Sequence, residues 1–293
     1  MLLSVLIPTL RRPELLRETL ESVLAADPLP DEVIVIDGEA GGSTAAVVAE
    51  LQPASGMPAL KVISSRPSVT HQRNEGIDAA EGDVLVFLDD DVAVDPKLFA
   101  TLAQAYSEDA IVGATGRVVE PAAHRIGGHQ SVIRRILFTG VPEGFFAPFG
   151  YPRYIIDAER KRDVEFMPGC LMSVKKEAAR RIRFDEELTG YALAEDEDFS
   201  YRLSRAGRIV YLPDAVVEHK KTGFATANAR EFGRKVVANR TYLFRKNFRP
   251  NVWKWLQFVL LFVVLLGHRL VNREWAGARG LVQGMREAWL RRP

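Results

Sequence analysis

Residues 83–91 read DVLVFLDDD, so an apolar run of five residues is followed at once by three aspartates. A short run that is apolar at every position is typical of a strand covered on both faces. Three like charges at the end of such a strand repel one another, and burial makes each of them costlier. The stretch therefore predicts a buried strand that ends at a site where a counter-charge is needed.

Segments of the same kind recur through the first half of the chain and alternate with helical patterns. Alternation of this kind is typical of βαβ units and a parallel sheet. We expect an α/β fold of the Rossmann-like class, with a mostly parallel sheet and helices on both faces. The expected strands are residues 3–8, 32–37, 60–65 and 83–89, and the expected helices are residues 13–26, 43–51, 68–82 and 95–106.

The composition is that of a globular protein, with 47% hydrophobic and 26% charged residues among 293. The net charge of +1 supports neither a nucleic acid nor an acidic partner. Cys170 is the single cysteine, which excludes an intramolecular disulfide and fits a reducing cytosol. The apolar N-terminus has neither the basic region nor the cleavage site of a signal peptide, so we expect a buried strand there.

A change in composition near Thr222 predicts two domains, residues 1–222 and residues 223–293. The second is expected to be helical. Its first part is strongly basic, and a nearly uncharged run at residues 255–266 follows.

Polar residues stand at the ends of three of the expected strands. In an open parallel sheet, ligands bind outside the carboxyl ends of the strands. Pro8, Thr9, Asp37 and the aspartates Asp89, Asp90 and Asp91 should therefore open onto one side. A divalent cation with oxygen ligands, Mg²⁺ or Mn²⁺, would neutralise the aspartates and accept the oxygens of a bound diphosphate.

Two other interpretations of the triplet are open. The aspartates could shape a turn and cap the next helix, although Asp95 already occupies the better capping position. They could also form a phosphatase motif, which requires Thr or Val where this chain has Ala93.

The chain resembles the inverting family-two glycosyltransferases, which have the GT-A fold, over about residues 3–247. The resemblance depends on the order and spacing of several motifs. These are SVLIPTLRRPELLRETLESV, EVIVID ending at Asp37, HQRNEGIDAAEGDVLVFLDDD, PGCLMSVKKEA and FDEELTGYALAEDEDFSYRLSRAG.

The resemblance implies a role for each matching residue on the donor side. Pro8 and Thr9 would flank the nucleotide, with Asp37 on its base or ribose and Arg73 on the base or diphosphate. Asp89 and Asp91 would be the DxD pair and the candidate metal ligands, with Asp91 the more direct one. Asp89 and Asp90 are also expected close to the nucleotide. The family also has a metal-binding histidine at the end of a late strand, where this chain has His219.

A second acidic cluster, Glu195 to Asp198, lies in a separate segment. An ion pair with Arg202 one helical turn on explains Asp198. The resemblance implies that Asp196 is the base that deprotonates the acceptor hydroxyl and that Glu195 positions or binds the acceptor. Residues 166–172 are expected to line the acceptor side.

The apolar run at residues 255–266 is shorter than the ~20 residues of a membrane span. A buried or dimer helix, an interfacial helix and a tilted span all remain open for residues 253–271. Tryptophans and flanking cations favour peripheral or monotopic attachment to the cytoplasmic face of the cell membrane. The preceding arginines and lysines could attract anionic lipid or a lipid-linked acceptor.

These observations predict a metal-dependent, inverting glycosyltransferase. It would use a nucleotide-sugar donor and a glycan or lipid-linked acceptor, in cell-surface polysaccharide or lipid-linked glycan synthesis. The alternative is a catalytically silent nucleotide-binding scaffold at a membrane, since Gly38-Glu39-Ala40 departs from the Asp-Gly-Ser that often follows Asp37 in the family. A nucleotidyltransferase on the same fold is a third candidate.

Overall fold

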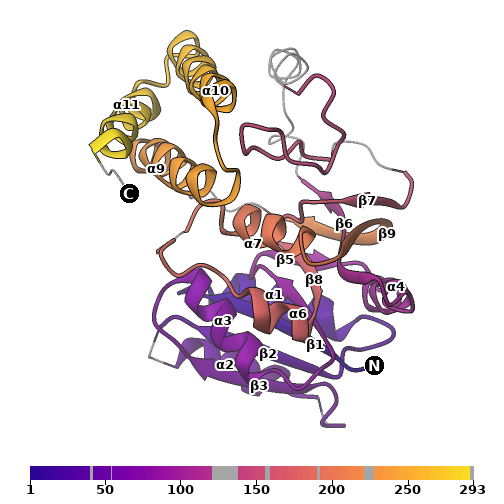
Figure 1. Cartoon of the computed structure of the whole chain (residues 1–293). Coiled ribbons are helices and arrows are strands. Elements are labelled where there is room, and N and C mark those ends of the chain that lie inside the picture. The colour runs from indigo at the N-terminus through magenta and orange to yellow at the C-terminus, as the bar shows by residue number, and fades with distance from the viewer. Residues whose placement is uncertain are drawn as a thin grey trace. The chain divides into compact units, whose positions relative to one another are not determined.

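In the computed structural model, the alternation seen in the sequence forms the parallel part of a sheet. The strands β1 (Leu3–Thr9), β2 (Glu32–Asp37), β3 (Ala59–Ser64) and β4 (Val84–Leu88) pair in the order β3-β2-β1-β4 (Figure 1). All three of their pairings are parallel, as the βαβ pattern predicts.

Residues 1–39, 42–53, 55–120, 138–155, 159–189, 192–220 and 228–290 are described by the structure. They belong to two units, one of residues 1–125 and 155–221 and the other of residues 126–154 and 222–293. The predicted domain boundary near Thr222 lies outside the described residues.

The first unit continues the sheet with strands from the middle of the chain. These are β5 (Val92–Val94), β6 (Ile111–Val119), β7 (Arg162–Val164), β8 (Leu171–Lys175) and β9 (Arg208–His219). The order continues β4-β8-β6-β9-β5, and β7 also pairs with β9. The pairings of β4 with β8, β8 with β6, β9 with β5 and β9 with β7 are antiparallel, so the whole sheet is mixed.

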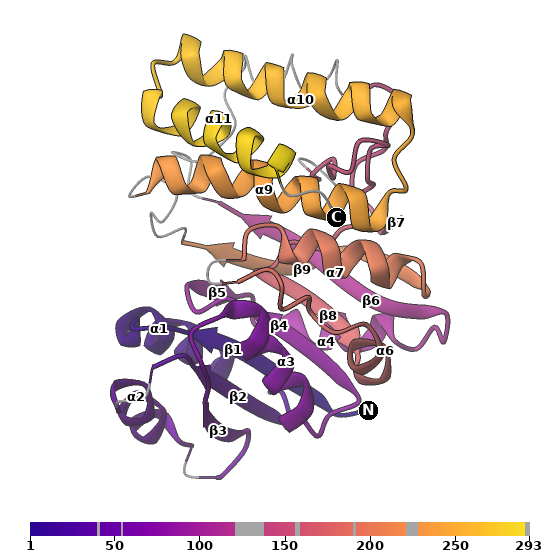
Figure 2. The same cartoon turned by 60° about the vertical axis from the view of Figure 1, so that its left-hand side comes forward.

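Helices cover both faces of this sheet, as predicted, and each face has its own apolar core. The first core holds α1 (Pro13–Leu24), α2 (Ser43–Leu51) and α4 (Leu98–Ala105) against alternate strand residues such as Val5 and Val86. The second holds α3 (Val69–Ala79), α6 (Lys176–Ile182) and α7 (Glu195–Ser204) against Leu6 and Phe87 (Figure 2). Strand β4 is apolar at every position, and β1 and β2 are largely so, because both faces of this part of the sheet are buried.

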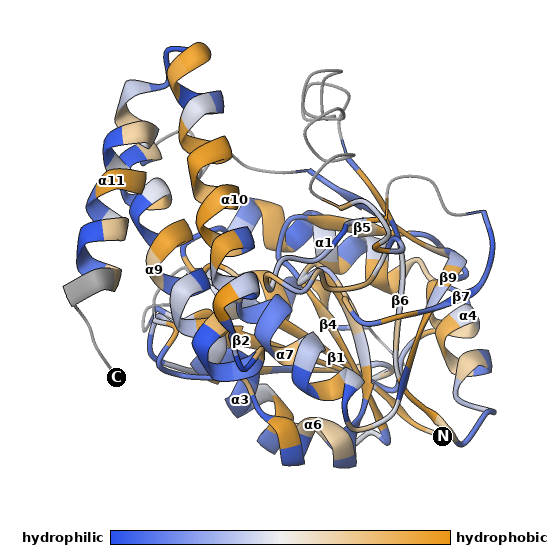
Figure 3. Ribbon diagram, turned by 45° about the horizontal axis from the view of Figure 1, so that its top comes forward, coloured by the Kyte–Doolittle hydropathy of each residue, from blue (hydrophilic) through white to orange (hydrophobic). Residues whose placement is uncertain are grey.

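The second unit contains three long helices, α9 (Ala229–Asn247), α10 (Val252–Val271) and α11 (Trp275–Leu290). Glycine allows α9 and α11 to pack closely, because a Cβ on Gly280 would lie 2.0 Å from the carbonyl oxygen of Arg230. Phe258 of α10 stacks on Phe244 of α9 with ring centroids 4.4 Å apart. Figure 3 shows α10 as predominantly hydrophobic along its length.

Part of a long connection also belongs to this second unit. Within residues 138–154, Tyr151 lies under the guanidinium of Arg240, whose Cζ is 3.6 Å from the ring centroid. Gly150, at φ +80°, lies against Phe244 and Phe248. The segment is therefore anchored on α9.

Candidate active site

The sheet brings the ends of three parallel strands to one edge. Thr9 and Asp37 end β1 and β2 and are paired in register, and Asp89 directly follows β4, which pairs with β1 on its other side. The predicted donor-side residues therefore share the carboxyl edge of the sheet, where open α/β sheets bind ligands.

A glutamine that sequence reasoning did not select holds this edge together. The Nε2 of Gln72 donates to the backbone oxygens of Thr9, at 2.9 Å, and Ile36, at 2.7 Å. The buried side chain of Asp37 accepts from the backbone N–H of Glu39 at 2.9 Å. Pro8 pairs with Ile36 in the β1–β2 ladder. The signal in the sequence that could have pointed to Gln72 is its position directly before Arg73 in the motif HQRNEG.

Asp90, the middle member of the triplet, faces β1 and α1. It accepts from the hydroxyl of Thr9 at 2.7 Å and from Nη1 of Arg12 at 3.2 Å. Burial raises the pKa of Asp90 to about 6, against the opposing effect of Thr9 and Arg12. Its predicted contact with the nucleotide stays a prediction. Arg12 was not selected from the sequence, although it follows the first strand closely.

Asp89 and Asp91 lie together with His219. One ligand atom of each lies within 4.8 Å of the other two, and Nε2 of His219 is 3.1 Å from Asp91 Oδ1 and 3.9 Å from Asp89 Oδ2. The register of β5 on β9 explains this, because it pairs Val92, the neighbour of Asp91, with His219. Two carboxylates and an imidazole form a donor set that suits Mn²⁺, and its oxygens suit Mg²⁺.

Arg73 connects this cluster with the second acidic cluster. Its side chain is 1% exposed. Nη2 donates to Asp89 Oδ1 at 3.1 Å and to the carbonyl of Gly169 at 3.0 Å, and Nη1 donates to Glu195 Oε1 at 2.9 Å. Burial alone would lower the pKa of Arg73, but the carboxylates of Glu195, Asp89 and Asp196 raise it. Arg73 therefore supplies a fixed positive charge between two acidic segments.

One atom of this buried guanidinium has no partner in the part of the chain that the structure describes. Nε of Arg73 makes no hydrogen bond to any residue that the structure describes. A buried donor without a partner is costly, and such atoms are uncommon in folded proteins.

Gly169 lies at the junction of these groups. Its N–H donates to Asp196 Oδ2 at 3.0 Å, and its carbonyl accepts from Arg73. A Cβ at this position would be 3.2 Å from Arg73 Nη2 and 3.4 Å from Glu195 Oε1. The absence of a side chain thus lets the 166–172 segment approach both clusters.

Two carboxyls at the start of α7 bind protons more tightly than usual. Burial raises the pKa of Asp196 well above its ordinary value, and the charges of Glu195 and Glu197 add to this effect. Burial also raises the pKa of Glu195, while Arg73 opposes the change. A carboxyl whose pKa is raised is a stronger base once it has lost its proton.

Contacts behind the site fix the segment that leads to α7. Asn74 of α3 donates to the carbonyl of Phe184 at 3.0 Å and accepts from its N–H at 2.8 Å. The hydroxyl of Thr70 donates to the carbonyl of Leu188 at 2.9 Å. Helix α3 therefore carries Arg73 and also positions the chain that precedes the acidic cluster.

Cys170 is buried beside the site, as the sequence predicts. Burial raises the pKa of its thiol well above the usual value, and the neighbouring aspartates act in the same direction. The neutral thiol is a small packing group and a poor nucleophile.

Comparison with solved structures shows the fold of known glycosyltransferases. A mannosyltransferase, PcManGT from Pyrobaculum calidifontis, in complex with GDP-Man and Mn²⁺, superposes with a TM-score of 0.62 at 16% identity, covering 99% of this chain and 88% of that one. GalNAc-T7 with UDP, GalNAc and Mn²⁺ gives 0.61 at 17% identity over 83% of this chain and 50% of that one. S. aureus TarS 1–349 gives 0.58 at 18% identity, over 88% and 69%.

A sequence search of curated proteins finds no match. The sequence profile described as "Glycosyl transferase family 2" matches residues 4–183. The matched part contains the strand-end residues, Arg73, the aspartate triplet and Gly169, and it ends before Asp196 and His219. Because the profile covers more than half of the chain, the protein belongs to glycosyltransferase family 2.

Proposed function

We propose that the protein is a metal-dependent, inverting glycosyltransferase that moves a sugar from a nucleoside diphosphate to an acceptor hydroxyl. The observation that carries the proposal is the double contact of Arg73, which joins Asp89 of the metal-ligand cluster to Glu195 of the acidic helix. The leaving-group and acceptor sides of the reaction would then meet at one fixed charge.

The donor side fits a divalent cation through Asp89, Asp91 and His219. When bound, Mn²⁺ or Mg²⁺ would offset the charge that develops on the leaving diphosphate. Two of the structural relatives, PcManGT and GalNAc-T7, were obtained with Mn²⁺ and with GDP-Man or UDP, which supports a nucleotide-sugar donor. Thr9 and Asp37 lie on the same edge and are proposed to contact the nucleoside.

On the acceptor side, Asp196 is proposed as the base. It would remove the proton of the acceptor hydroxyl as that oxygen attacks the anomeric carbon, while the bond from that carbon to the diphosphate oxygen breaks. Attack from the face opposite the leaving group inverts the configuration. Glu195, held by Arg73, would position the acceptor.

The second unit is proposed to hold the enzyme on the cytoplasmic face of the cell membrane. Helix α10 is 20 residues long, has a mean hydropathy of 1.6 in its most apolar window and has 17% of that window buried. A membrane-bound enzyme of this class would serve lipid-linked or cell-surface glycan synthesis.

The test is release of nucleoside diphosphate from a panel that includes GDP-mannose and UDP-sugars, with Mn²⁺, Mg²⁺ or EDTA. We expect turnover with one donor, its loss in EDTA and its recovery on adding metal. NMR of the product should show an inverted anomeric centre. Binding without turnover across the panel would indicate the scaffold function, and release of pyrophosphate would indicate a nucleotidyltransferase.

A further inference from the structure

Helix α10 uses only one of its faces for packing within the second unit. Phe258, Leu261 and Phe262 are buried, and Phe258 stacks on α9. The other face remains apolar although it is exposed, whereas a surface helix of a soluble domain carries polar residues there. Its exposed side chains are Val252, Trp253, Leu256, Val259, Leu260, Val263, Leu270 and Val271.

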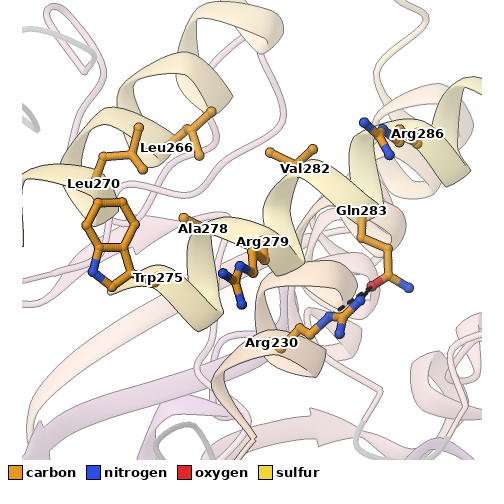
Figure 4. Close-up of a pocket in the computed structure, with 9 residues that line it drawn as sticks. All are labelled: Arg230, Leu266, Leu270, Trp275, Ala278, Arg279, Val282, Gln283 and Arg286. Carbon is orange, nitrogen blue, oxygen red and sulfur yellow. Dashed lines mark hydrogen bonds between the residues drawn. The ribbon is translucent and has the colours of Figure 1, made fainter. Parts of the chain in front are cut away.

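A cavity of about 490 Å³ adjoins this face, with walls from α9, α10 and α11 (Figure 4). Leu266 and Leu270 contribute apolar wall from α10, and Trp275 and Val282 contribute it from α11. Leu270 and Trp275 are also exposed, so the cavity opens directly beside the apolar face.

Three arginines surround these apolar walls. Arg279 and Arg286 are seven residues apart on α11, which places them two turns apart on one side of the helix. Neither forms a hydrogen bond or an ion pair with any residue that the structure describes, and both are exposed. Arg230 of α9 donates to Gln283 Oε1 at 3.0 and 3.2 Å, as the dashed line in Figure 4 shows. None of the described residues that line the cavity carries a carboxylate.

The second unit is strongly basic, although the net charge of the whole protein is close to zero. Residues 228–290 contain twelve lysines and arginines and three glutamates, a net charge of +9, in a protein whose formal total is +1. The remaining residues are therefore net acidic. Cations concentrated beside an exposed apolar face match an anionic lipid surface, which offers phosphates and hydrocarbon together. A nucleic acid offers the phosphates but nothing for the apolar face.

We propose that this cavity binds the phosphate head group of an anionic glycerophospholipid. Arg279 and Arg286 hold the phosphate, Arg230 adds charge, and Leu266, Leu270 and Val282 contact the upper acyl chain. The exposed face of α10 then lies among the acyl chains. The inference rests on the membrane attachment proposed above and names the lipid class and the residues that select it.

The experiment is flotation of the whole protein with vesicles of phosphatidylcholine, alone or mixed with phosphatidylglycerol. We expect binding to the mixed vesicles and much weaker binding to pure phosphatidylcholine. The Arg279→Gln/Arg286→Gln variant should bind the mixed vesicles at least about 100-fold more weakly, because it loses two arginine–phosphate hydrogen bonds between charged groups. Val282→Glu places a carboxylate between the two arginines and should also abolish the preference.

Arg249→Gln/Arg273→Gln is the matched control. Both of its arginines are exposed, lie in the same unit and are absent from the cavity wall, so the loss of charge is equal. We expect it to retain most of the binding. Equal losses in the two double variants would mean that diffuse charge attracts the protein, and this outcome would overturn the proposal of a cavity site.

Two further outcomes would count against a lipid site. If inorganic phosphate at constant ionic strength releases the protein from vesicles, the cavity is a site for soluble phosphate. If the protein ignores all vesicles and forms a dimer that Leu256→Glu dissociates, α10 is a protein interface and membrane attachment fails as well. Nucleotide-sugar turnover by vesicle-free protein tests the active site separately, so failures of the two proposals can be told apart.

Discussion

Arg73 and Glu195 form an ion pair of 2.9 Å in which the guanidinium is 1% and the carboxylate 13% exposed. The second nitrogen of the same guanidinium contacts Asp89 at 3.1 Å. An arginine from α3 therefore offsets the charge of one of the three aspartates within the protein, and Arg12 contacts the other two. The ion pair of Arg73 with Glu195 joins residues that are 122 positions apart in the chain.

Replacing Arg73 should affect stability as well as activity. Arg73→Met leaves Asp89 and Glu195 without their cation, and breaking a buried pair in this way costs about 3–5 kcal/mol of unfolding free energy. Urea denaturation followed by circular dichroism measures this loss. Arg73→Lys keeps the charge but cannot reach three acceptors at once, so it should fold and lose activity.

The control for Arg73 is Arg66, an arginine seven positions earlier in the chain that forms an exposed ion pair. Arg66 contacts Glu186 with a side chain that is 61% exposed. Arg66→Met should therefore change the unfolding free energy by no more than about 1 kcal/mol. Equal losses in Arg66→Met and Arg73→Met would contradict the role assigned to the buried pair.

Gly169→Ala should lower the turnover number with little loss of stability. The new methyl group would lie 3.2 Å from Arg73 Nη2, so the guanidinium must shift by a few tenths of an ångström, and the methyl group would touch Glu195 Oε1 at 3.4 Å. Small displacements of this kind can reduce a rate by up to about 100-fold. Steady-state kinetics measure the effect, and Gly267→Ala, which meets no atom within 4 Å, is the control.

The parallel half of the sheet was predictable because the mostly apolar composition of its strands indicates that they are buried. The segments that form β1, β2 and β4 are buried at every position and consist mostly of apolar residues, and the helices between them have clear boundaries. Strand β5 has only three residues, too few for any periodicity. The antiparallel pairings of β8 and β9 depend on contacts between distant residues, which a local pattern does not contain.

The same distinction applies to the site. The position of the strand-end aspartates at one edge was predictable, because ligands bind at the carboxyl ends of parallel strands. The position of His219 beside them was not, because it depends on the register of β5 on β9. Arg12 and Gln72 make contacts with Asp90 and with the ends of β1 and β2 that no motif encodes. Sequence reasoning selected Arg73 as a nucleotide contact, whereas its ion pairs to both acidic segments could be seen only in three dimensions.

Substitution of a proposed metal ligand should weaken Mn²⁺ binding, whereas substitution of the neighbouring Asp90 should not. Asp91→Asn and His219→Ala should each weaken Mn²⁺ binding at least tenfold. Removing a residue that only supports a metal ligand already costs about 10–100-fold in affinity, and removing the ligand itself should cost no less. Electron paramagnetic resonance of free Mn²⁺ measures the affinity without substrate. Asp90→Asn keeps an acceptor for the Thr9 hydroxyl and should leave the affinity nearly unchanged. Stronger loss in Asp90→Asn than in Asp91→Asn would refute the assignment.

Asp196→Asn should abolish most of the transfer while leaving donor binding intact. The amide oxygen can still accept from Gly169 N–H, but it cannot take a proton from the acceptor, and loss of such a base costs about 10²–10⁴ in rate. Comparing the turnover number with the dissociation constant of the donor tests this. Asp163→Asn, at an exposed ion pair with Arg208, is the matched control and should retain full activity.

The raised pKa of Asp196 also predicts two opposite dependences on pH. The rate should rise with pH while the base loses its proton, so kcat/KM should have an ascending limb through the native pKa. Stability should change in the other direction. Because the native carboxyl holds its proton more tightly than the unfolded chain does, its stabilising contribution is complete below the ordinary pKa of 3.8 and is lost as pH rises through the native value.

The unfolding free energy of wild type should therefore fall relative to that of Asp196→Asn as pH rises above the ordinary pKa of 3.8. Urea titrations in EDTA at several pH values measure this difference without interference from bound metal. Asparagine does not titrate, so any slope in the difference belongs to Asp196 and to the neighbouring carboxyl of Glu195, whose pKa is also raised. A difference that stays constant with pH would show that Asp196 is already ionised in the native protein, and its assignment as a base with a raised pKa would then be wrong.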